Sequence, residues 1–126
     1  MAGSSLLPLE GKCTVVIGGT SGLGHSAVKA FIAAGSKVVA VGLPHDDAGS
    51  EGLTREFGPS AQVVWADATL PGTAPSAIEQ CLSSFGGFDA LYHVAGGSGR
   101  RWGDGPLHDI TDQGWSKTLE LNLSSV

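Results

Sequence analysis

A glycine-rich turn that joins a short apolar run to a helix-like segment constrains the fold of this chain more than any other feature. The apolar run is 15–17, and the turn has the spacing Gly18-x3-Gly22-x-Gly24. Glycines at this spacing omit the Cβ atoms where a chain turns sharply and where its backbone approaches a ligand. A helix after such a turn points free N–H groups and the positive end of its dipole at the turn. The pattern therefore predicts a strand, a turn that binds pyrophosphate, and a helix.

The helix after the turn is predicted to have one apolar face and a defined end. That face carries Leu23, Ala27, Phe31 and Ala34, which are spaced so that they lie on one side of a helix. We expect this side to pack on a sheet. Gly35 is placed as the stop, because glycine readily adopts the left-handed conformation that ends many helices.

Apolar runs and helix-like segments alternate along the whole chain. This alternation is typical of crossover units around a parallel sheet, and right-handed crossovers give the spatial strand order 3-2-1-4. The sequence therefore predicts an α/β fold of the Rossmann type, with helices on both faces of a parallel sheet, in one domain over 1–126. Strands are expected at 13–18, 37–42, 62–66 and 90–95, and helices at 22–34, 48–57, 75–85 and from 112 onward.

Composition narrows the class of protein. With 126 residues the chain is short for a complete doubly wound enzyme, so we expect the N-terminal part of a longer domain. A net charge of −5 argues against nucleic acid as a partner. The segment MAGSSLLPLEGK has neither a basic start nor a sustained apolar core, so we expect no secretion signal, no membrane partner and a cytoplasmic location. The histidines lack metal-ligand spacing, which predicts no metal site, and Cys13 and Cys81 are expected to be buried thiols.

The turn Gly18-Gly19-Thr20-Ser21-Gly22-Leu23-Gly24 resembles the cofactor-binding turn of the short-chain dehydrogenase/reductase family. The resemblance extends over 11–126, although the family usually carries Thr where this chain has Ile17. It implies an NAD(P)-dependent oxidoreductase that transfers hydride between a nicotinamide and a small alcohol or carbonyl substrate, in a homo-oligomer. In this turn the resemblance assigns to the cofactor Gly18, Thr20, Ser21, Gly22, Leu23 and Gly24.

The end of the second strand is expected to choose between NAD and NADP. An acidic side chain there accepts hydrogen bonds from the ribose of NAD, whereas an arginine pairs with the 2′-phosphate of NADP. NAD-type members of the family often have Asp where this chain has Gly42, and NADP-type members often have Arg in place of Leu43. Asp46 and Asp47 are either ordinary turn residues or ribose ligands that repel a phosphate. We expect Leu43 to contact the cofactor, with a slight preference for NAD.

Two further strand ends carry candidate cofactor residues. Asp67 closes the third strand and is followed by Ala68. A carboxylate there usually caps the next segment, but in the family the matching Asp accepts from the adenine amino group. In the fourth strand, Ala95 and Gly96 keep the family pattern and let the backbone lie against the cofactor. His93 stands where the family has an asparagine, and we expect it to be a hydrogen-bonded core histidine.

The glycine-rich loop 97–106 follows that strand and contains Arg100, Arg101 and Trp102. We expect it to open into the same crevice as the glycine turn, because both follow the carboxyl ends of parallel strands. Two interpretations stay open. The loop closes over a substrate or a phosphate, or it is a solvated loop whose arginines bind nothing specific.

The last helix is predicted to begin at Thr111 as N-cap and to carry Trp115, Leu119 and Val126 on an apolar stripe. Asn122 falls on that stripe. A specific hydrogen-bonding role is expected for it, because an unpaired buried amide costs about 1–3 kcal/mol. In the family, the matching Asn belongs to a catalytic tetrad and holds a water in the proton relay.

The rest of that tetrad is a Ser, and a Tyr followed four residues later by a Lys. The one tyrosine of this chain is Tyr92, and Gly96 stands four residues after it. We therefore expect the cofactor-binding half of such an oxidoreductase, without catalytic activity of its own. The alternative is a non-catalytic dinucleotide-binding or interaction module.

Overall fold

The structure is a computed structural model that describes residues 6–44 and 48–126. It contains a parallel sheet of four strands in the order β3-β2-β1-β4, which confirms the predicted topology. The strands are β1 (Cys13–Ile17), β2 (Lys37–Gly42), β3 (Ala61–Trp65) and β4 (Ala90–His93). The helices are α1 (Gly22–Ala33), α2 (Ala48–Phe57), α3 (Thr73–Phe85) and α4 (Asp112–Leu119), with 3-10 turns at Gly58–Ser60 and Arg100–Trp102 and a π-helical turn at Glu120–Ser124.

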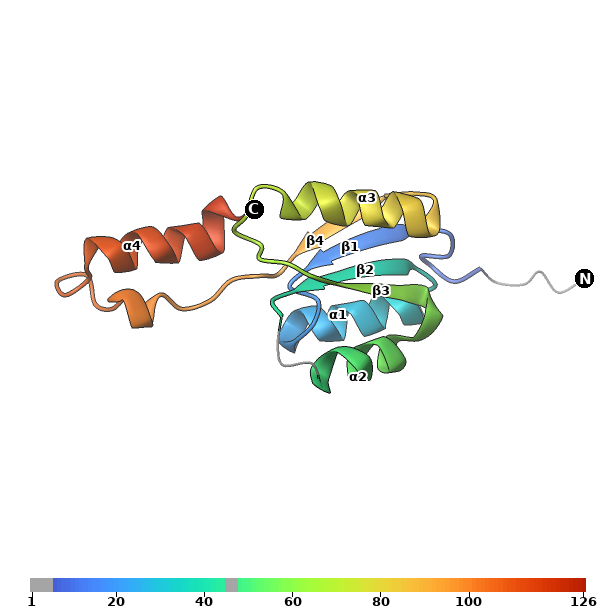
Figure 1. Ribbon diagram of the computed structural model, residues 1–126, viewed down its shortest axis with the longest axis horizontal. Coiled ribbons are helices and arrows are strands. Elements are labelled where there is room, and N and C mark those ends of the chain that lie inside the picture. Colours follow the sequence, from blue (N-terminus) through green and yellow to red (C-terminus); the bar gives the residue numbers. More distant parts are fainter. Residues whose placement is uncertain (1–5, 45–47) are drawn as a thin grey trace, which may run out of the picture.

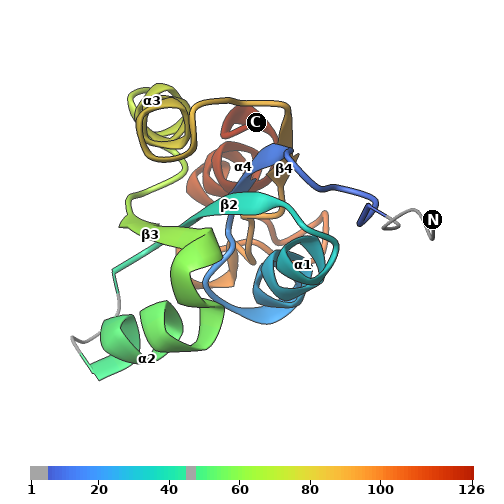
Figure 2. The same ribbon diagram turned by 90° about the vertical axis from the view of Figure 1, so that its right-hand side faces the viewer.

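Helices cover both faces of the sheet. Figures 1 and 2 show α3 on one face and α1 with α2 on the other. The side chains of β1 alternate between these faces, because successive residues of a strand point to opposite sides. Val15 and Ile17 pack with Cys81 of α3, whereas Val16 packs with Val28 of α1. The central strands are thus buried on both sides, which explains their continuous apolar sequence.

Both cysteines are free and buried, as predicted. Burial raises the pKa of the Cys81 thiol to about 11. This thiol therefore stays protonated at neutral pH and packs as a small apolar side chain.

The carboxyl ends of the strands meet at one edge of the sheet, where Ile17 pairs with Val41 of β2 and His93 of β4. The strand order reverses at β1, because β2 and β3 lie on one side of it and β4 on the other. Loops at such a switch point diverge and leave room for a ligand. In Figure 1, α4 and the loop before it project beyond this edge.

All predicted elements are present, and most boundaries agree within one residue. β4 is an exception, because it ends at His93 and not at residue 95. The N–H groups of Val94 and Ala95 both donate to the Ile17 carbonyl, so the regular ladder stops there.

α3 begins at Thr73 instead of at residue 75. The Thr73 hydroxyl donates to the Asp67 carbonyl and ties the start of the helix to the end of β3. Pro75 is tolerated in the first turn, because the N–H that it lacks has no helical partner at that position.

The apolar face predicted for α1 is wrong at its first residue. Leu23 is 79% exposed, and Val28 is fully buried. Gly24 lies so close to the Gly18 carbonyl that no Cβ fits between them. This contact turns Gly24 and Val28 toward the sheet and leaves Leu23 on the outer side of the first turn. The predicted stop is confirmed, since Gly35 is left-handed with a φ of 98°.

The apolar stripe predicted on the last helix is not buried. Thr111 is the N-cap as predicted, because its Oγ1 accepts from the Gly114 N–H. Trp115, Leu119 and Val126, however, are 53%, 38% and 78% exposed. The physical reason is the position of α4 beyond the sheet edge (Figure 1), where no other element of the described residues covers that side. The buried side of α4 carries Gly114 instead.

Candidate functional site

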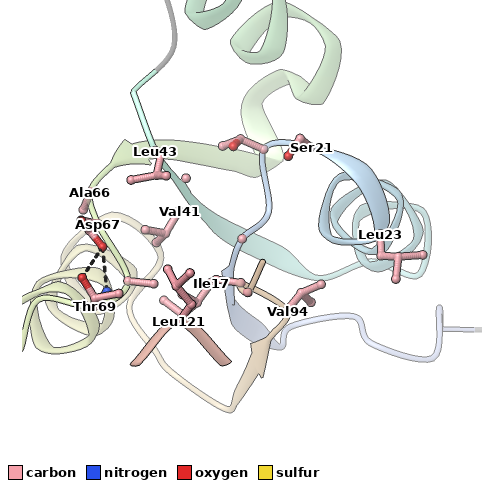
Figure 3. Close-up of a pocket in the computed structure, with 16 residues that line it drawn as sticks. Ile17, Ser21, Leu23, Val41, Leu43, Ala66, Asp67, Thr69, Val94 and Leu121 are labelled. Carbon is pink, nitrogen blue, oxygen red and sulfur yellow. Dashed lines mark hydrogen bonds between the residues drawn. The ribbon is translucent and has the colours of Figure 1, made fainter. Parts of the chain in front are cut away.

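A cavity of about 360 Å³ opens at the carboxyl edge of the sheet (Figure 3). Its walls come from the glycine turn, from the ends of β2, β3 and β4, and from the π-helical turn after α4. Most of the wall is apolar, and Asp67 is the charged residue among those that line it. The cavity therefore lies at the switch point of the sheet, where α/β folds bind their ligands.

The glycine turn forms the wall at the end of β1. Gly18 has a φ of 90°, and its N–H donates to the Val41 carbonyl, as does that of Gly19. A Cβ on Gly18 would lie 2.6 Å from the Ala95 nitrogen. Only glycine thus lets the turn pass between the ends of β2 and β4.

The start of α1 presents backbone donors beside the cavity. Ser21 is the N-cap residue, but its side chain makes no capping hydrogen bond. The first N–H groups of the helix therefore keep the donor capacity that an anion can use. Gly22 has a φ of 55°, and a Cβ on it would meet no atom within 4 Å. The turn is open at this point and can be approached by a bulky anion such as a pyrophosphate.

Gly42 and Leu43 form the β2 side of the cavity. A Cβ on Gly42 would lie 2.6 Å from the Thr20 Cγ2, so the threonine fills the place of a side chain at position 42. Leu43 is 54% exposed and contributes to the wall. Asp46 and Asp47, the two acidic candidates of this loop, lie outside the described residues.

Asp67 lies at the end of β3 (Figure 3). Its Oδ1 accepts from the Thr69 N–H at 2.8 Å and from the Thr69 hydroxyl at 2.7 Å. These two bonds hold the pKa of Asp67 below its usual value of 3.8, the hydroxyl being the larger cause, because they stabilise the charged form. Both bonds end on Oδ1, which leaves Oδ2 for a ligand in the cavity. The local capping role and a ligand-binding role of Asp67 are therefore compatible.

The end of β4 forms a further wall through Val94, Ala95 and Gly96. His93, just before it, is hydrogen-bonded as predicted, since its Nε2 lies 3.0 Å from the Ser125 carbonyl oxygen. A Cβ on Gly96 would lie 2.5 Å from Oδ1 of Asn122. The backbone at Gly96 is thus pressed against the π-helical turn.

Both the oxygen and the nitrogen of the Asn122 side-chain amide form hydrogen bonds with the backbone. Oδ1 accepts from the Gly97 N–H at 3.0 Å, and Nδ2 donates to the carbonyls of Gly97 and Thr118 at 2.8 Å each. The predicted hydrogen bonds of this side chain are present. Its predicted position facing the core is wrong, because the side chain is exposed. Both Nδ2 hydrogens are used. A water bound to this side chain would therefore donate a hydrogen bond to Oδ1, which can accept a second one.

The glycine-rich loop after β4 packs along α4. A Cβ on Gly99 would collide with the Thr118 hydroxyl, and one on Gly103 would lie 2.7 Å from the Thr111 Cγ2. From the helix side, a Cβ on Gly114 would lie 2.6 Å from the Gly103 carbonyl oxygen. We call this contact of Gly99, Gly103, Thr111, Gly114 and Thr118 the glycine seam. The expectation that the loop opens into the crevice is wrong, because the seam holds it against the helix.

Two cations of this region flank an aromatic ring and not the cavity. The Arg101 guanidinium lies 4.4 Å from the centre of the Trp102 ring, and the Lys117 ammonium lies 5.8 Å from it. Lys117 also pairs with Glu120 at 2.8 Å. These side chains therefore stabilise the loop and α4 against each other.

The structure brings most of the predicted cofactor residues to one cavity. Those that line it are Gly18, Thr20, Ser21, Leu23, Leu43, Asp67, Ala68, Ala95 and Gly96. Gly22 and Gly24 stand beside it in the first turn of α1, and Asn122 follows Leu121, which lines it. The sequence interpretation missed the lining residues Ile17, Val41, Ala66, Thr69, Val94 and Leu121. Most of these are strand-end residues, which the rule that ligands bind outside the carboxyl ends of strands can identify.

Within residues 6–44 and 48–126, no group of three or more His, Cys, Asp or Glu side chains is placed to hold a metal ion. Nor does this described part contain a helix that is long and apolar enough to cross a membrane.

Comparisons with known proteins agree with this geometry. The sequence profile of the short chain dehydrogenase family matches residues 12–126. A 3-alpha-(or 20-beta)-hydroxysteroid dehydrogenase of Mycobacterium tuberculosis is 33% identical over 118 residues, which are 94% of this chain and 43% of that protein. A 3-oxoacyl-(acyl-carrier-protein) reductase of Escherichia coli is 29% identical over 117 residues, which are 93% of this chain and 46% of that protein.

Among solved structures, a 3-ketoacyl-(acyl-carrier-protein) reductase from Brucella melitensis, complexed with NADH, matches with a TM-score of 0.77 at 30% identity. The match covers 94% of this chain and 47% of the reductase chain. The chain thus spans a little less than half the length of each of these relatives.

Proposed function

The chain belongs to the short-chain dehydrogenase family, and on that premise we propose that it forms the dinucleotide-binding part of an NAD(P)-dependent oxidoreductase. The observation that carries the proposal is the cavity at the switch point of the sheet, lined by the glycine turn and by Asp67. When bound, the cofactor supplies or accepts a hydride in a reaction with an alcohol or carbonyl substrate.

The residues present fit a dinucleotide. The open approach at Gly22 and the uncapped first turn of α1 suit a pyrophosphate, which backbone N–H groups would hold. Oδ2 of Asp67 would accept from the adenine amino group, with Leu43 and Ala68 against the adenosine. At the other end of the cavity, the backbone at Ala95 would lie against the nicotinamide half.

We propose NAD in preference to NADP. Among the described residues, those that line the cavity include no arginine or lysine that could pair with a 2′-phosphate. The Asp67 carboxylate adds a negative charge to the same cavity, which disfavours a further phosphate.

We further propose a cytoplasmic homo-oligomer acting on a small molecule, in which Asn122 holds a water of the proton relay. Support for the oligomer comes from apolar side chains that α4 and the π-helical turn expose, since Leu119 and Leu123 are 38% and 67% accessible. Such exposed apolar surface is typical of protein interfaces.

The second candidate is a dinucleotide-binding module without catalysis. It is favoured by Tyr92, the one tyrosine of the chain, which is not among the residues that line the cavity and whose ring centre lies 6.0 Å from that of Phe31. General acid catalysis needs a positioned proton donor. Turnover of an alcohol or carbonyl by the 126-residue chain would exclude this second candidate.

A titration followed by amide NMR tests the proposed site. NADH should shift the amide signals of Gly18, Ser21, Asp67 and Ala95, which surround the cavity. The smaller ligand 5′-AMP should shift the signal of Asp67 and spare that of Ala95. Signals that respond elsewhere on the protein, or nowhere, would contradict the proposed function.

A further inference from the structure

A hydrogen bond from the end of β4 links the sheet to the segment that contains α4 and the π-helical turn. His93 is the last residue of β4, and its Nε2 lies 3.0 Å from the carbonyl oxygen of Ser125, 32 residues later. Within residues 6–44 and 48–126, this is the one hydrogen bond between a strand of the sheet and the segment 112–126. His93 thus adds a hydrogen bond from the sheet itself to the two bonds by which Asn122 holds that segment to the Gly97 backbone.

The chemistry of the link defines the state of the imidazole. A carbonyl oxygen only accepts hydrogen bonds, so the hydrogen must sit on Nε2 of His93. A phenylalanine at this position keeps the ring but loses the donor. A glutamine keeps a donor of similar reach, whose amide N–H can replace the imidazole N–H.

The link continues from Ser125 to the cavity wall. The Ser125 hydroxyl donates to the Leu121 carbonyl at 2.9 Å, and the Ser125 N–H donates to the Glu120 carbonyl at 3.1 Å. Leu121 lines the cavity, where Figure 3 shows its side chain, and Asn122 binds the Gly97 backbone. Ser125, the C-cap of the π-helical turn, thus connects His93 to both the wall and the loop. Turns of this kind are frequent at functional sites, because they re-aim the side chains of a helix.

We propose that His93 is a positioning residue for the dinucleotide site. Through Ser125 it holds Leu121 against the cavity and keeps Asn122 in reach of Gly97, at the end where the nicotinamide half would lie. This inference rests on the proposed function and assigns to His93 a role at that same site. It does not require His93 to contact the cofactor.

The test compares His93→Phe with His93→Gln, and uses His108→Phe as a control. His108 is exposed and pairs with its neighbour Asp109 at 3.2 Å, outside the site. Two quantities are measured in each protein: the hydrogen-exchange rate of the Gly97 N–H, and the dissociation constants for NADH and for 5′-AMP. In His93→Phe we expect Gly97 exchange to rise and NADH binding to weaken, each by about fivefold, the effect of one typical hydrogen bond. Binding of 5′-AMP should be unchanged, and His93→Gln should restore both values.

The outcomes distinguish a failure of the positioning role of His93 from a failure of the proposed function. Unchanged Gly97 exchange and NADH affinity in His93→Phe would overturn the proposal. Equal losses of NADH and 5′-AMP affinity would also overturn it, because they indicate a general loss of fold. If the wild-type chain binds neither nucleotide, the proposed function fails. Faster Gly97 exchange in His93→Phe, restored in His93→Gln, would then still support His93 as the residue that positions the turn.

Discussion

The side chain of Thr20 occupies the space in which a side chain on Gly42 would begin, with 2.6 Å between the Thr20 Cγ2 and the place of such a Cβ. This contact joins the glycine turn to the end of β2. Packing of the glycine turn against the sheet is thus enough to explain why position 42 carries no side chain. The identity of residue 42 cannot be interpreted for cofactor choice without that of residue 20.

We predict that Gly42→Asp destabilises the protein by about 1–3 kcal/mol, the usual cost of overpacking a close contact. The double variant Gly42→Asp with Thr20→Gly should recover most of this loss, because it removes the colliding side chain. Urea unfolding measures both. Gly52→Asp is the control, since a Cβ there meets nothing within 4 Å. If the effects of the two substitutions on the unfolding free energy are additive, the collision with Thr20 is not the cause of the loss in Gly42→Asp.

Leu43→Arg is predicted to improve NADPH binding by about 10-fold to 100-fold, because a guanidinium facing a phosphate contributes about 1.5–3 kcal/mol. Leu43 already lies on the cavity wall and is 54% exposed, so a longer side chain needs no repacking. The uncharged variant Leu43→Gln is the matched control and should gain nothing. A tenfold preference of the wild-type chain for NADPH over NADH would contradict the proposed cofactor choice.

Thr69→Val should raise the pKa of Asp67 toward 3.8, because it removes the hydroxyl donor that is the larger cause of the lowered value. A carboxyl whose pKa is lower in the folded state stabilises the fold above its unfolded pKa, near 4. That contribution disappears as the pH falls through the folded-state pKa. The wild type should therefore be more stable than Thr69→Val at pH 7, by a margin that shrinks below about pH 4.

Carbon NMR of the Asp67 carboxyl gives its pKa directly, and urea unfolding at several pH values gives the margin. Thr69→Ser keeps the hydroxyl and should resemble the wild type. An Asp67 pKa that is equal in the wild type and Thr69→Val would show that the hydroxyl bond does not form in solution.

The strand order and the glycine turn could be predicted from sequence because their signals are local. Apolar runs, helix periods and glycine spacing each report on a few neighbouring residues. The side of α1 that packs on the sheet could not be predicted in the same way. It depends on the contact between Gly24 and the Gly18 carbonyl, and Leu23 satisfies the helical pattern equally well until that contact is known.

In the candidate site, too, features with a local sequence motif could be predicted, whereas those that depend on contacts between distant residues could not. The candidate cofactor residues of the turn and Asp67 could be proposed from motifs, and in the structure most of them line one cavity. The loop after β4 resembled a mobile glycine-rich segment, because its partners in the glycine seam stand on α4. Without the geometry, Gly99 gives no sign that it needs to be small to fit against Thr118.

Gly99→Ala tests the glycine seam. A Cβ at this position collides with the Thr118 hydroxyl, so we expect a loss of about 1–3 kcal/mol of unfolding free energy. Gly105→Ala in the same loop is the control, because a Cβ there meets nothing within 4 Å. Hydrogen exchange of the loop amides should be faster in Gly99→Ala alone. Equal behaviour of the two variants would mean that the loop does not pack along α4.

The most direct test of the proposed dinucleotide site is calorimetric titration of NADH into the wild-type chain, Gly22→Val and Gly86→Val. Gly22 and Gly86 are both left-handed, with φ of 55° and 77°, and a Cβ on either meets nothing within 4 Å. The two substitutions therefore strain the backbone similarly, but only that at Gly22 fills the approach to the turn. We expect the wild type and Gly86→Val to bind one NADH per chain and Gly22→Val to bind none. Equal affinity in all three proteins, or no binding by the wild type, would contradict the site.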